Sequence, residues 1–329
     1  EIGPKVSNIS RIAISRSQPA VVYAGTPDGF VFRSTDAGIS WTTTNDGLPH
    51  SFISGMEVHP TDPNTVYVAL YAQGIYITRD GGLTWALSSP AAINDGIIDV
   101  HIDPSNGAKL FATTGKNQVW RSTDTGQTWS KSSTGIFLTG VHGLMVSPSN
   151  PQIIYAAHYT NTFIKSTDGG TTWTPKDFSG GSCNMVVHPT DPNTVFACGN
   201  AGGFLKSTDG GNGWATYTNG LPTDKMFHWI VINPQNPAQI WLASLGTDLL
   251  YRSDDGGLNW AAASNGLQGN KLVFYVYATG RLFGAGNNAG IYKSTDAGVT
   301  WSASNASLPH DRITAAATDP SNPYTLYAS

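Results

Sequence analysis

Residues 34–41 read STDAGISW, and six near copies of this octapeptide follow along the chain. They are TRDGGLTW (78–85), STDTGQTW (122–129), STDGGTTW (166–173), STDGGNGW (207–214), SDDGGLNW (253–260) and STDAGVTW (294–301). The tryptophans that end them are 44, 44, 44, 41, 46 and 41 residues apart. Because a period of about 20–50 residues indicates one supersecondary unit per repeat, the chain is a repeat protein.

Each repeat contains four short segments of strand character. In the second repeat these are ISGMEVHP (53–60), TVYVAL (65–70), GIYITRD (74–80) and a last segment that the tryptophan begins. Runs of Val, Ile and Tyr between turn residues are typical of strands. Four antiparallel strands in about 43 residues is the period of a propeller blade. We therefore predict an all-β fold, a seven-bladed β-propeller of four-stranded antiparallel blades with an extra half repeat at the C-terminus.

The octapeptide suits the turn between the third and fourth strands. Its Asp and Ser side chains can hydrogen-bond to the backbone of their own turn, and its Gly adopts a positive φ without strain. Its tryptophan offers a large apolar surface for packing between blades. No repeat has the number of ligands that calcium needs, so we expect neither a metal nor a cofactor. The residues to which we assign this structural role are Asp36, Asp80, Asp124, Asp168, Asp209, Asp255, Asp296, Trp41, Trp85, Trp129, Trp173, Trp214, Trp260 and Trp301.

The pattern S-x-D-x-G-x-x-W resembles the Asp-box, or BNR repeat, and only Thr78 departs from its first position. The regular spacing is similar to that of the propeller branch that includes xyloglucanases, sortilins and photosystem II assembly factors. This resemblance implies a β-propeller in which the box is a structural turn remote from the ligand. It says little about function, because these families differ in what they do.

Composition limits the function. Charged residues make up 12% of the chain, the net charge is -4, and the basic residues are scattered, so we expect no nucleic-acid partner. No apolar run approaches the roughly 20 residues of a membrane span. The chain begins at Glu1 with neither a Met nor a signal peptide, and we interpret it as a processed chain or part of a longer one. We expect it to be extracellular or on the cell surface.

The catalytic residues of two enzyme classes limit the function further. The arginine cluster and the Tyr-Glu nucleophile pair of sialidases are not found, and Arg33, Arg121 and Arg252 instead share one repeat position that suits a solvated strand face. A xyloglucanase-like glycoside hydrolase needs two carboxyl groups roughly 5 to 10 Å apart. Asp28 and Asp248 are the weak candidates for these groups, on loops with no evident reason to converge. We therefore predict a non-catalytic binding or scaffold propeller, with one propeller of such a hydrolase as the alternative.

The loops opposite the octapeptide turns carry the candidate ligand-binding residues. Aromatic rings at such loops suit stacking on a peptide or a sugar, so we expect a protein or polysaccharide partner there. His50 and His310 occupy equivalent LPH positions, and His59 and His188, each before a proline, are expected to cap turns. The candidate binding residues are Tyr71, His158, Tyr159, Phe178, Phe227 and His228.

The two cysteines lie on either side of a predicted hairpin. A turn near Asp191 would place Cys183 opposite Cys198, at a cross-strand separation within disulfide range. Two buried thiols are an equally good interpretation.

The repeat count does not close at the C-terminus. Residues 311–329 repeat the first two strands of an eighth unit, after a lead-in at residues 1–9 and seven complete repeats at residues 10–310. Three outcomes stay open: the chain is part of a longer protein, the extra pair packs on the propeller as a partial blade, or it completes a neighbouring copy in self-assembly. We expect residues 312–329 to lie near residues 10–26.

Overall fold

The structure is a computed structural model of the 329-residue chain. It describes residues 11–36, 40–89, 93, 96–116, 118–132, 141–158, 162–178, 184–198, 203–244, 250–267, 272–278, 281–286, 290–303, 316–318 and 326–328. The chain forms two compact units. Unit 1 comprises residues 1–134, 138–142 and 314–329, and unit 2 comprises residues 135–137 and 143–313.

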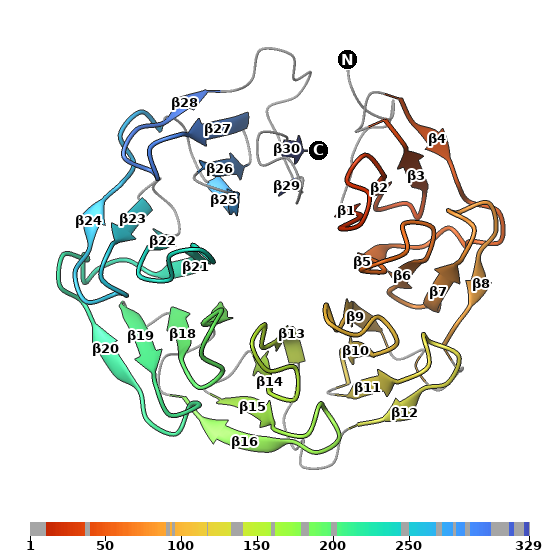
Figure 1. The fold of residues 1–329 in the computed structure, drawn as a ribbon, viewed down its shortest axis with the longest axis horizontal. Helices are drawn as coiled ribbons and strands as arrows, with labels where there is room; N and C mark the ends of the chain where they lie inside the picture. Colours follow the sequence, from red (N-terminus) through yellow and green to blue (C-terminus); the bar gives the residue numbers. More distant parts are fainter. Residues whose placement is uncertain are drawn as a thin grey trace. The chain divides into compact units, whose positions relative to one another are not determined.

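Unit 1 holds three four-stranded sheets and one two-stranded sheet (Figure 1). The strands of the first sheet are β1 (Arg11–Ile14), β2 (Val22–Gly25), β3 (Val31–Ser34) and β4 (Thr42–Thr43). Those of the second are β5 (Ile53–Val58), β6 (Val66–Leu70), β7 (Gly74–Thr78) and β8 (Ala86–Leu87). Those of the third are β9 (Ile97–Ile102), β10 (Leu110–Thr114), β11 (Val119–Ser122) and β12 (Ser130–Lys131). The two-stranded sheet consists of β29 (Ala316–Thr318) and β30 (Leu326–Ala328), and β29 lies beside β1.

Unit 2 holds four four-stranded sheets. The strands of the first two are β13 (Val141–Val146), β14 (Ile154–His158), β15 (Thr162–Ser166), β16 (Thr174–Asp177), β17 (Met185–Val187), β18 (Val195–Cys198), β19 (Phe204–Ser207) and β20 (Ala215–Tyr217). Those of the last two are β21 (Phe227–Ile232), β22 (Ile240–Ser244), β23 (Leu250–Ser253), β24 (Ala261–Ala262), β25 (Leu272–Ala278), β26 (Arg281–Gly286), β27 (Gly290–Ser294) and β28 (Ser302–Ala303).

Every four-stranded sheet is an antiparallel meander in sequence order, which is the topology of a propeller blade. The described residues thus form seven complete blades and a two-stranded sheet, as the repeat pattern predicts. In such a meander the turn between the second and third strands lies at the opposite end of the sheet from the turn between the third and fourth. The octapeptides occupy the latter turns, so the former are free to differ from blade to blade.

Each octapeptide turn is closed by hydrogen bonds of one aspartate. In the third repeat, the Ser122 hydroxyl donates to Asp124 Oδ1 at 2.8 Å and accepts the Gly126 N–H at 2.9 Å. The Thr128 N–H donates to the same carboxylate oxygen at 2.9 Å. The Thr128 hydroxyl donates to the other oxygen of the carboxylate. The hydrogen bonds to the carboxylate, that of the Thr128 hydroxyl foremost, lower the pKa of Asp124 to about 2. Thr78, which departs from the serine of the pattern, makes the equivalent bond to Asp80 at 2.7 Å.

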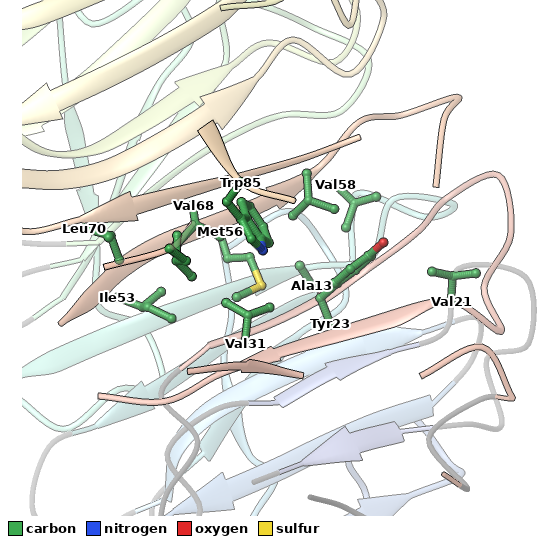
Figure 2. Packing of buried hydrophobic residues seen from close by; sticks show 12 residues of the cluster. Ala13, Val21, Tyr23, Val31, Ile53, Met56, Val58, Val68, Leu70 and Trp85 are labelled. Atoms are coloured by element: carbon green, nitrogen blue, oxygen red, sulfur yellow. The ribbon is translucent and has the colours of Figure 1, made fainter. Parts of the chain in front are cut away.

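The octapeptide tryptophan packs between neighbouring sheets. Trp85 directly precedes β8, and its indole N–H donates to the carbonyl of Thr44, beside β4 of the preceding sheet, at 2.6 Å. Its ring joins a buried cluster that contains residues from β1, β2, β3, β5 and β6, including Tyr23 and Met56 (Figure 2). The apolar face of one sheet is therefore covered by the next sheet, with the tryptophan between them.

The basic residues that precede the octapeptides also reach the next sheet. Lys206 donates to the carbonyl of Gly256 at 3.4 Å, and Arg252 donates to the carbonyl of Ala297 at 3.1 Å. Both acceptors belong to the octapeptide turn of the following repeat. The expected solvated strand face is thus a contact between sheets, which the period of the pattern could not show.

The pairing of the first and second strands in each sheet bears on whether Cys183 can lie opposite Cys198. In β5 the pairing shifts by one residue between Ile53 and Gly55, and β9 and β21 have the same shift at their beginnings. In β17 the main register pairs Met185 with Ala197, so an equivalent shift would bring position 183 opposite Cys198. Cys198 is buried, and Cys183 lies outside the described residues. The disulfide therefore stays a prediction.

We expect the protein, purified without reductant, to contain the Cys183–Cys198 disulfide. Non-reducing peptide mapping by mass spectrometry checks this, with a Cys183→Ser variant as the control that leaves one alkylatable thiol. Two alkylatable thiols in the wild-type protein would establish the alternative of two buried thiols.

Truncation of the octapeptide tryptophan should destabilise the fold strongly. We expect Trp85→Ala to lower the free energy of unfolding by about 3–5 kcal/mol, because it leaves a cavity between two sheets. Leu83→Ala in the same turn is the matched control, since Leu83 is 70% exposed and should change stability by no more than about 0.5 kcal/mol. Denaturant titration measures both, and equal midpoints for the two variants would contradict the packing role.

Candidate binding surface

The structure separates the predicted binding residues into exposed and buried ones. Tyr71, in the turn between β6 and β7, is 52% exposed. Phe178 and Phe227 are buried at 3% and 0%, where they contact the rings of Trp214 and Tyr251. We therefore remove these two phenylalanines from the binding candidates and assign them to the core. Their positions next to loops in the sequence did not reveal that the side chains point inward.

The other predicted residues are only partly described. His158 ends β14 and His228 lies in β21, but their side chains are outside the described part of the structure, as is all of Tyr159. Asp28 is an exposed residue of the turn between β2 and β3, and Asp248 lies outside the described residues. The pairing of Asp28 with Asp248 therefore stays a prediction.

Exposed aromatic residues gather on one set of loops in unit 1. Phe30 at the end of the β2–β3 turn is 38% exposed, and Phe52 just before β5 is 47% exposed. His50 is exposed on the same loop as Phe52. With Tyr71, these residues form what we call the loop surface: Phe30, His50, Phe52 and Tyr71. It lies at the end of the sheets opposite the octapeptide turns.

Contacts between the loops hold these side chains in one place. The rings of Phe30 and His50 lie 4.6 Å apart. Gly29 has φ +88°, and a Cβ there would collide with the backbone of Ser51, so only glycine lets the two loops pack this closely. The Tyr71 N–H donates to the carbonyl of Phe52 at 3.0 Å. The aromatic rings are therefore presented on a hydrogen-bonded backbone.

The loop surface continues to the third sheet of unit 1. The Ile97 N–H donates to the carbonyl of Tyr71 at 2.9 Å, and the Gly115 N–H donates to the carbonyl of Gly96 at 2.9 Å. The Tyr71 ring lies against Gly96, where an added Cβ would be 3.3 Å from its Cζ. Hydrogen bonds thus join the loops of the second and third sheets.

A second cluster of polar side chains lies on the first strands of the same sheets. Glu57 on β5 is partly buried, and Asp99 and His101 lie on the adjacent strand β9. Burial and the charge of Asp99 raise the pKa of Glu57 from its ordinary value of 4.5 to about 8, although Arg16 opposes the shift. Asp99 Oδ2 lies 3.6 Å from His101 Nε2.

Sequence reasoning identified Tyr71 and His50 but missed the other components. Phe30 follows the glycine of a turn, and Phe52 is the last residue before a strand, so both belong to strand-like runs that suggest a core position. Glu57 and Asp99 stand in first strands at positions that the octapeptide pattern does not include. A comparison of the loops after each second strand could have found Phe30, but only the packing shows that Asp99 lies against the strand that carries Glu57.

The histidines predicted to cap turns do so. His188 Nδ1 accepts the N–H groups of Thr190 and Asp191 at 3.3 and 3.2 Å, and His59 Nδ1 accepts that of Thr61 at 3.4 Å. Within the described ranges, no group of three or more His, Cys, Asp or Glu side chains is placed to hold a metal ion. The same residues include no helix that is long and apolar enough to cross a membrane.

The comparison with solved structures places the chain among β-propellers. It resembles YCF48 bound to D1 peptide with a TM-score of 0.65 at 18% identity, covering 88% of this chain and 94% of that chain. YCF48 from Cyanidioschyzon merolae gives a TM-score of 0.63 at 17% identity, covering 86% and 93%. An ancestral GH74 enzyme gives a TM-score of 0.56 at 16% identity, and the matched region covers 96% of this chain but only 56% of that enzyme. At these identities the likeness concerns the fold alone.

Family models agree with the fold. A Sortilin-Vps10 model (sortilin, neurotensin receptor 3) matches residues 29–131, in line with the Asp-box resemblance. No curated protein sequence matches the chain. A model of the DUF6242 beta propeller domain matches residues 105–326, more than half of the chain, and the protein therefore belongs to the DUF6242 beta propeller domain family.

Proposed function

We propose that the protein is a non-catalytic binding propeller that takes up a segment of a partner protein on the loop surface of unit 1. The observation that supports this is the group of exposed aromatic side chains on bonded loops, Phe30, Phe52 and Tyr71. The YCF48 propeller binds D1 peptide, and its fold is similar to this one. The D1 peptide is the ligand in the YCF48 structure, and the partner of this chain is to be found by experiment.

The chemistry of the loop surface favours a protein partner. Exposed aromatic rings on a rigid backbone bury a large apolar area at a small cost in conformational entropy, which is why such residues dominate binding energies at interfaces. Unit 2 carries a similar residue, since Met226 directly before β21 is 46% exposed at the position that corresponds to Phe52. A binding role for this position is therefore not confined to one blade.

We also propose an extracellular or cell-surface setting for this binding. The support is the predicted Cys183–Cys198 disulfide, since such bonds persist in oxidising compartments. A polysaccharide ligand and self-assembly through β29 and β30 are the other partners that the sequence suggests, and the binding experiment distinguishes them from a protein segment.

Removal of single rings from the loop surface should weaken binding without loss of stability. With a peptide selected from a random display library on the immobilised protein, we expect Phe52→Ala and Tyr71→Ala each to weaken the affinity by about tenfold or more, as for truncated hot-spot residues. Leu83→Ala is the control, because Leu83 is also a large exposed apolar residue, at 70%, but lies at the opposite end of the sheet. Calorimetry measures the affinity and thermal unfolding verifies the fold.

The outcome decides the partner class. If both variants select and bind the same peptides as the wild-type protein, the loop surface is not the site. A parallel glycan array in which binding depends on Phe52 and Tyr71 would replace the protein segment with a polysaccharide. Concentration-dependent dimerisation that survives both substitutions would favour self-assembly.

The glycoside hydrolase is the alternative function. The carboxyl pair proposed for it rests on Asp28, an exposed turn residue, and Asp248, which is not described. We expect the protein to release no reducing ends from xyloglucan or other β-glucans, in an assay with Asp28→Asn as the control. Release of reducing ends that is lost in Asp28→Asn would replace binding with catalysis.

A further inference from the structure

The first strands of the three four-stranded sheets in unit 1 are joined by side-chain hydrogen bonds. Arg11 on β1 donates from Nε and Nη2 to the carbonyl of Ser54 on β5, at 2.9 and 2.6 Å. The Ser54 hydroxyl donates to the carbonyls of Ile97 on β9 and Ala69 on β6, at 2.7 and 3.2 Å. A single bulge residue of β5 thereby connects β1, β5, β6 and β9.

The same bonds lie beside the loop surface. Phe52 directly precedes β5, and its carbonyl accepts the N–H of Tyr71. The carbonyl of Tyr71 in turn accepts the N–H of Ile97, the first residue of β9. The positions of Phe52 and Tyr71 therefore depend on how closely β5 and β9 pack.

Close packing of β5 and β9 places Asp99 against the strand that carries Glu57. Gly55 leaves the space that Asp99 occupies, since a Cβ at Gly55 would collide with Asp99 Oδ1 and lie 2.9 Å from the backbone nitrogen of Val100. Glu57 stands two residues further along β5. In the described part of the chain, its carboxyl group has neither a hydrogen bond nor an ion pair, whereas Asp99 Oδ1 accepts the Val100 N–H at 2.9 Å.

The charged and titratable groups around Glu57 come from four segments. Arg11 on β1 is engaged with Ser54, and Arg16 after β1 is exposed. Tyr67 on β6 pairs with Glu57 across the sheet, but its hydroxyl donates to the carbonyl of Thr125 at 3.0 Å. On β9, His101 lies near Asp99. Arg16 is thus the cation left to offset an ionised Glu57.

We propose that Glu57 and Asp99 form a proton-controlled contact between β5 and β9, which holds the loop surface in place while Glu57 is protonated and loosens it once Glu57 is ionised. The contact itself is independent of any ligand, and its role in regulating binding rests on the proposed function. Two carboxylates on adjacent strands repel each other, whereas one carboxylic acid beside one carboxylate does not. The neutral form is thus the one that the packing of β5 against β9 accommodates.

The direction of the pH effect follows from the raised pKa of Glu57. Between pH 4.5 and about 8, Glu57 keeps its proton in the folded protein but has released it in the unfolded chain. The contribution of Glu57 to the free energy of unfolding is therefore fully present below pH 4.5, declines over this range and is lost as pH rises through about 8. The loosening itself should occur near pH 8, where the folded protein releases the proton.

Hydrogen exchange followed by mass spectrometry tests the contact without a ligand. The exchange rates are measured between pH 6.5 and 9.5 and corrected for intrinsic exchange. We expect residues 52–58 and 96–102 of the wild-type protein to exchange about tenfold faster above the pH at which Glu57 ionises than below it. A tenfold change corresponds to a pKa shift of about one unit. Residues 122–132, around the third octapeptide turn, provide the internal reference. Glu57→Gln should abolish the transition.

Two further variants keep the test decisive if Glu57→Gln folds poorly. Asp99→Asn removes the repelling charge and should move the transition to lower pH, whereas Arg16→Gln removes the opposing cation and should move it to higher pH. A transition that stays unchanged in Glu57→Gln, or that shifts in the same direction in the other two variants, would overturn the proposal.

Peptide binding separates the contact from its regulatory role. If a peptide selected on the loop surface binds more weakly at pH 9 than at pH 7 in the wild-type protein but not in Glu57→Gln, the contact regulates the site. Equal affinities at both pH values, with the exchange transition present, would overturn the regulation alone. An absence of any selected peptide bears on the proposed function and leaves the exchange result valid.

Discussion

The hydrogen bonds of one aspartate in each repeat support the rest of the structure. In the third repeat, the carboxylate of Asp124 accepts the hydroxyl of Ser122, two residues before it, and the backbone N–H of Thr128, four residues after it. These two hydrogen bonds fix the turn between β11 and β12. Because a tryptophan directly precedes the strand that leaves this turn, the turn also sets where the indole ring enters the space between two sheets. The local hydrogen bonds of the Asp124 carboxylate, whose pKa they lower, thus determine a buried contact between sheets, although the carboxylate itself is largely exposed.

The sheets are then joined by three kinds of contact that recur with the period of the repeat. The tryptophan reaches back, as Trp85 does to the carbonyl of Thr44, and the basic residue before the octapeptide reaches forward, as Arg252 does to Ala297. Second-strand aromatic residues also reach forward, since the Tyr67 hydroxyl donates to the carbonyl of Thr125. These recurring contacts lie at the octapeptide end, so the loops at the other end can differ from blade to blade without disturbing them.

The sequence predicted the fold because the fold depends on spacing, and spacing is visible in one dimension. The period gave the blades, and the turn residues gave the strand boundaries, down to His188 as a turn cap. Side-chain direction was harder to predict. Phe227 and Phe52 both lie where a loop meets a first strand, yet Phe227 is fully buried and Phe52 is 47% exposed. In register, Phe227 corresponds to Ile53, the residue after Phe52, and neighbouring strand residues point to opposite faces.

The register shift at the start of β5 explains why the candidate site has two parts that no motif connects. The bulge in β5 turns Ser54 so that its hydroxyl bonds to β9, and it leaves Phe52 on the solvent side of the loop. Gly55, the next residue, admits the Asp99 side chain, whose charge adds to burial in raising the pKa of Glu57. Since one irregularity orients the aromatic ring and places the acid pair, a change in the packing of β5 against β9 cannot leave the loop surface unaffected.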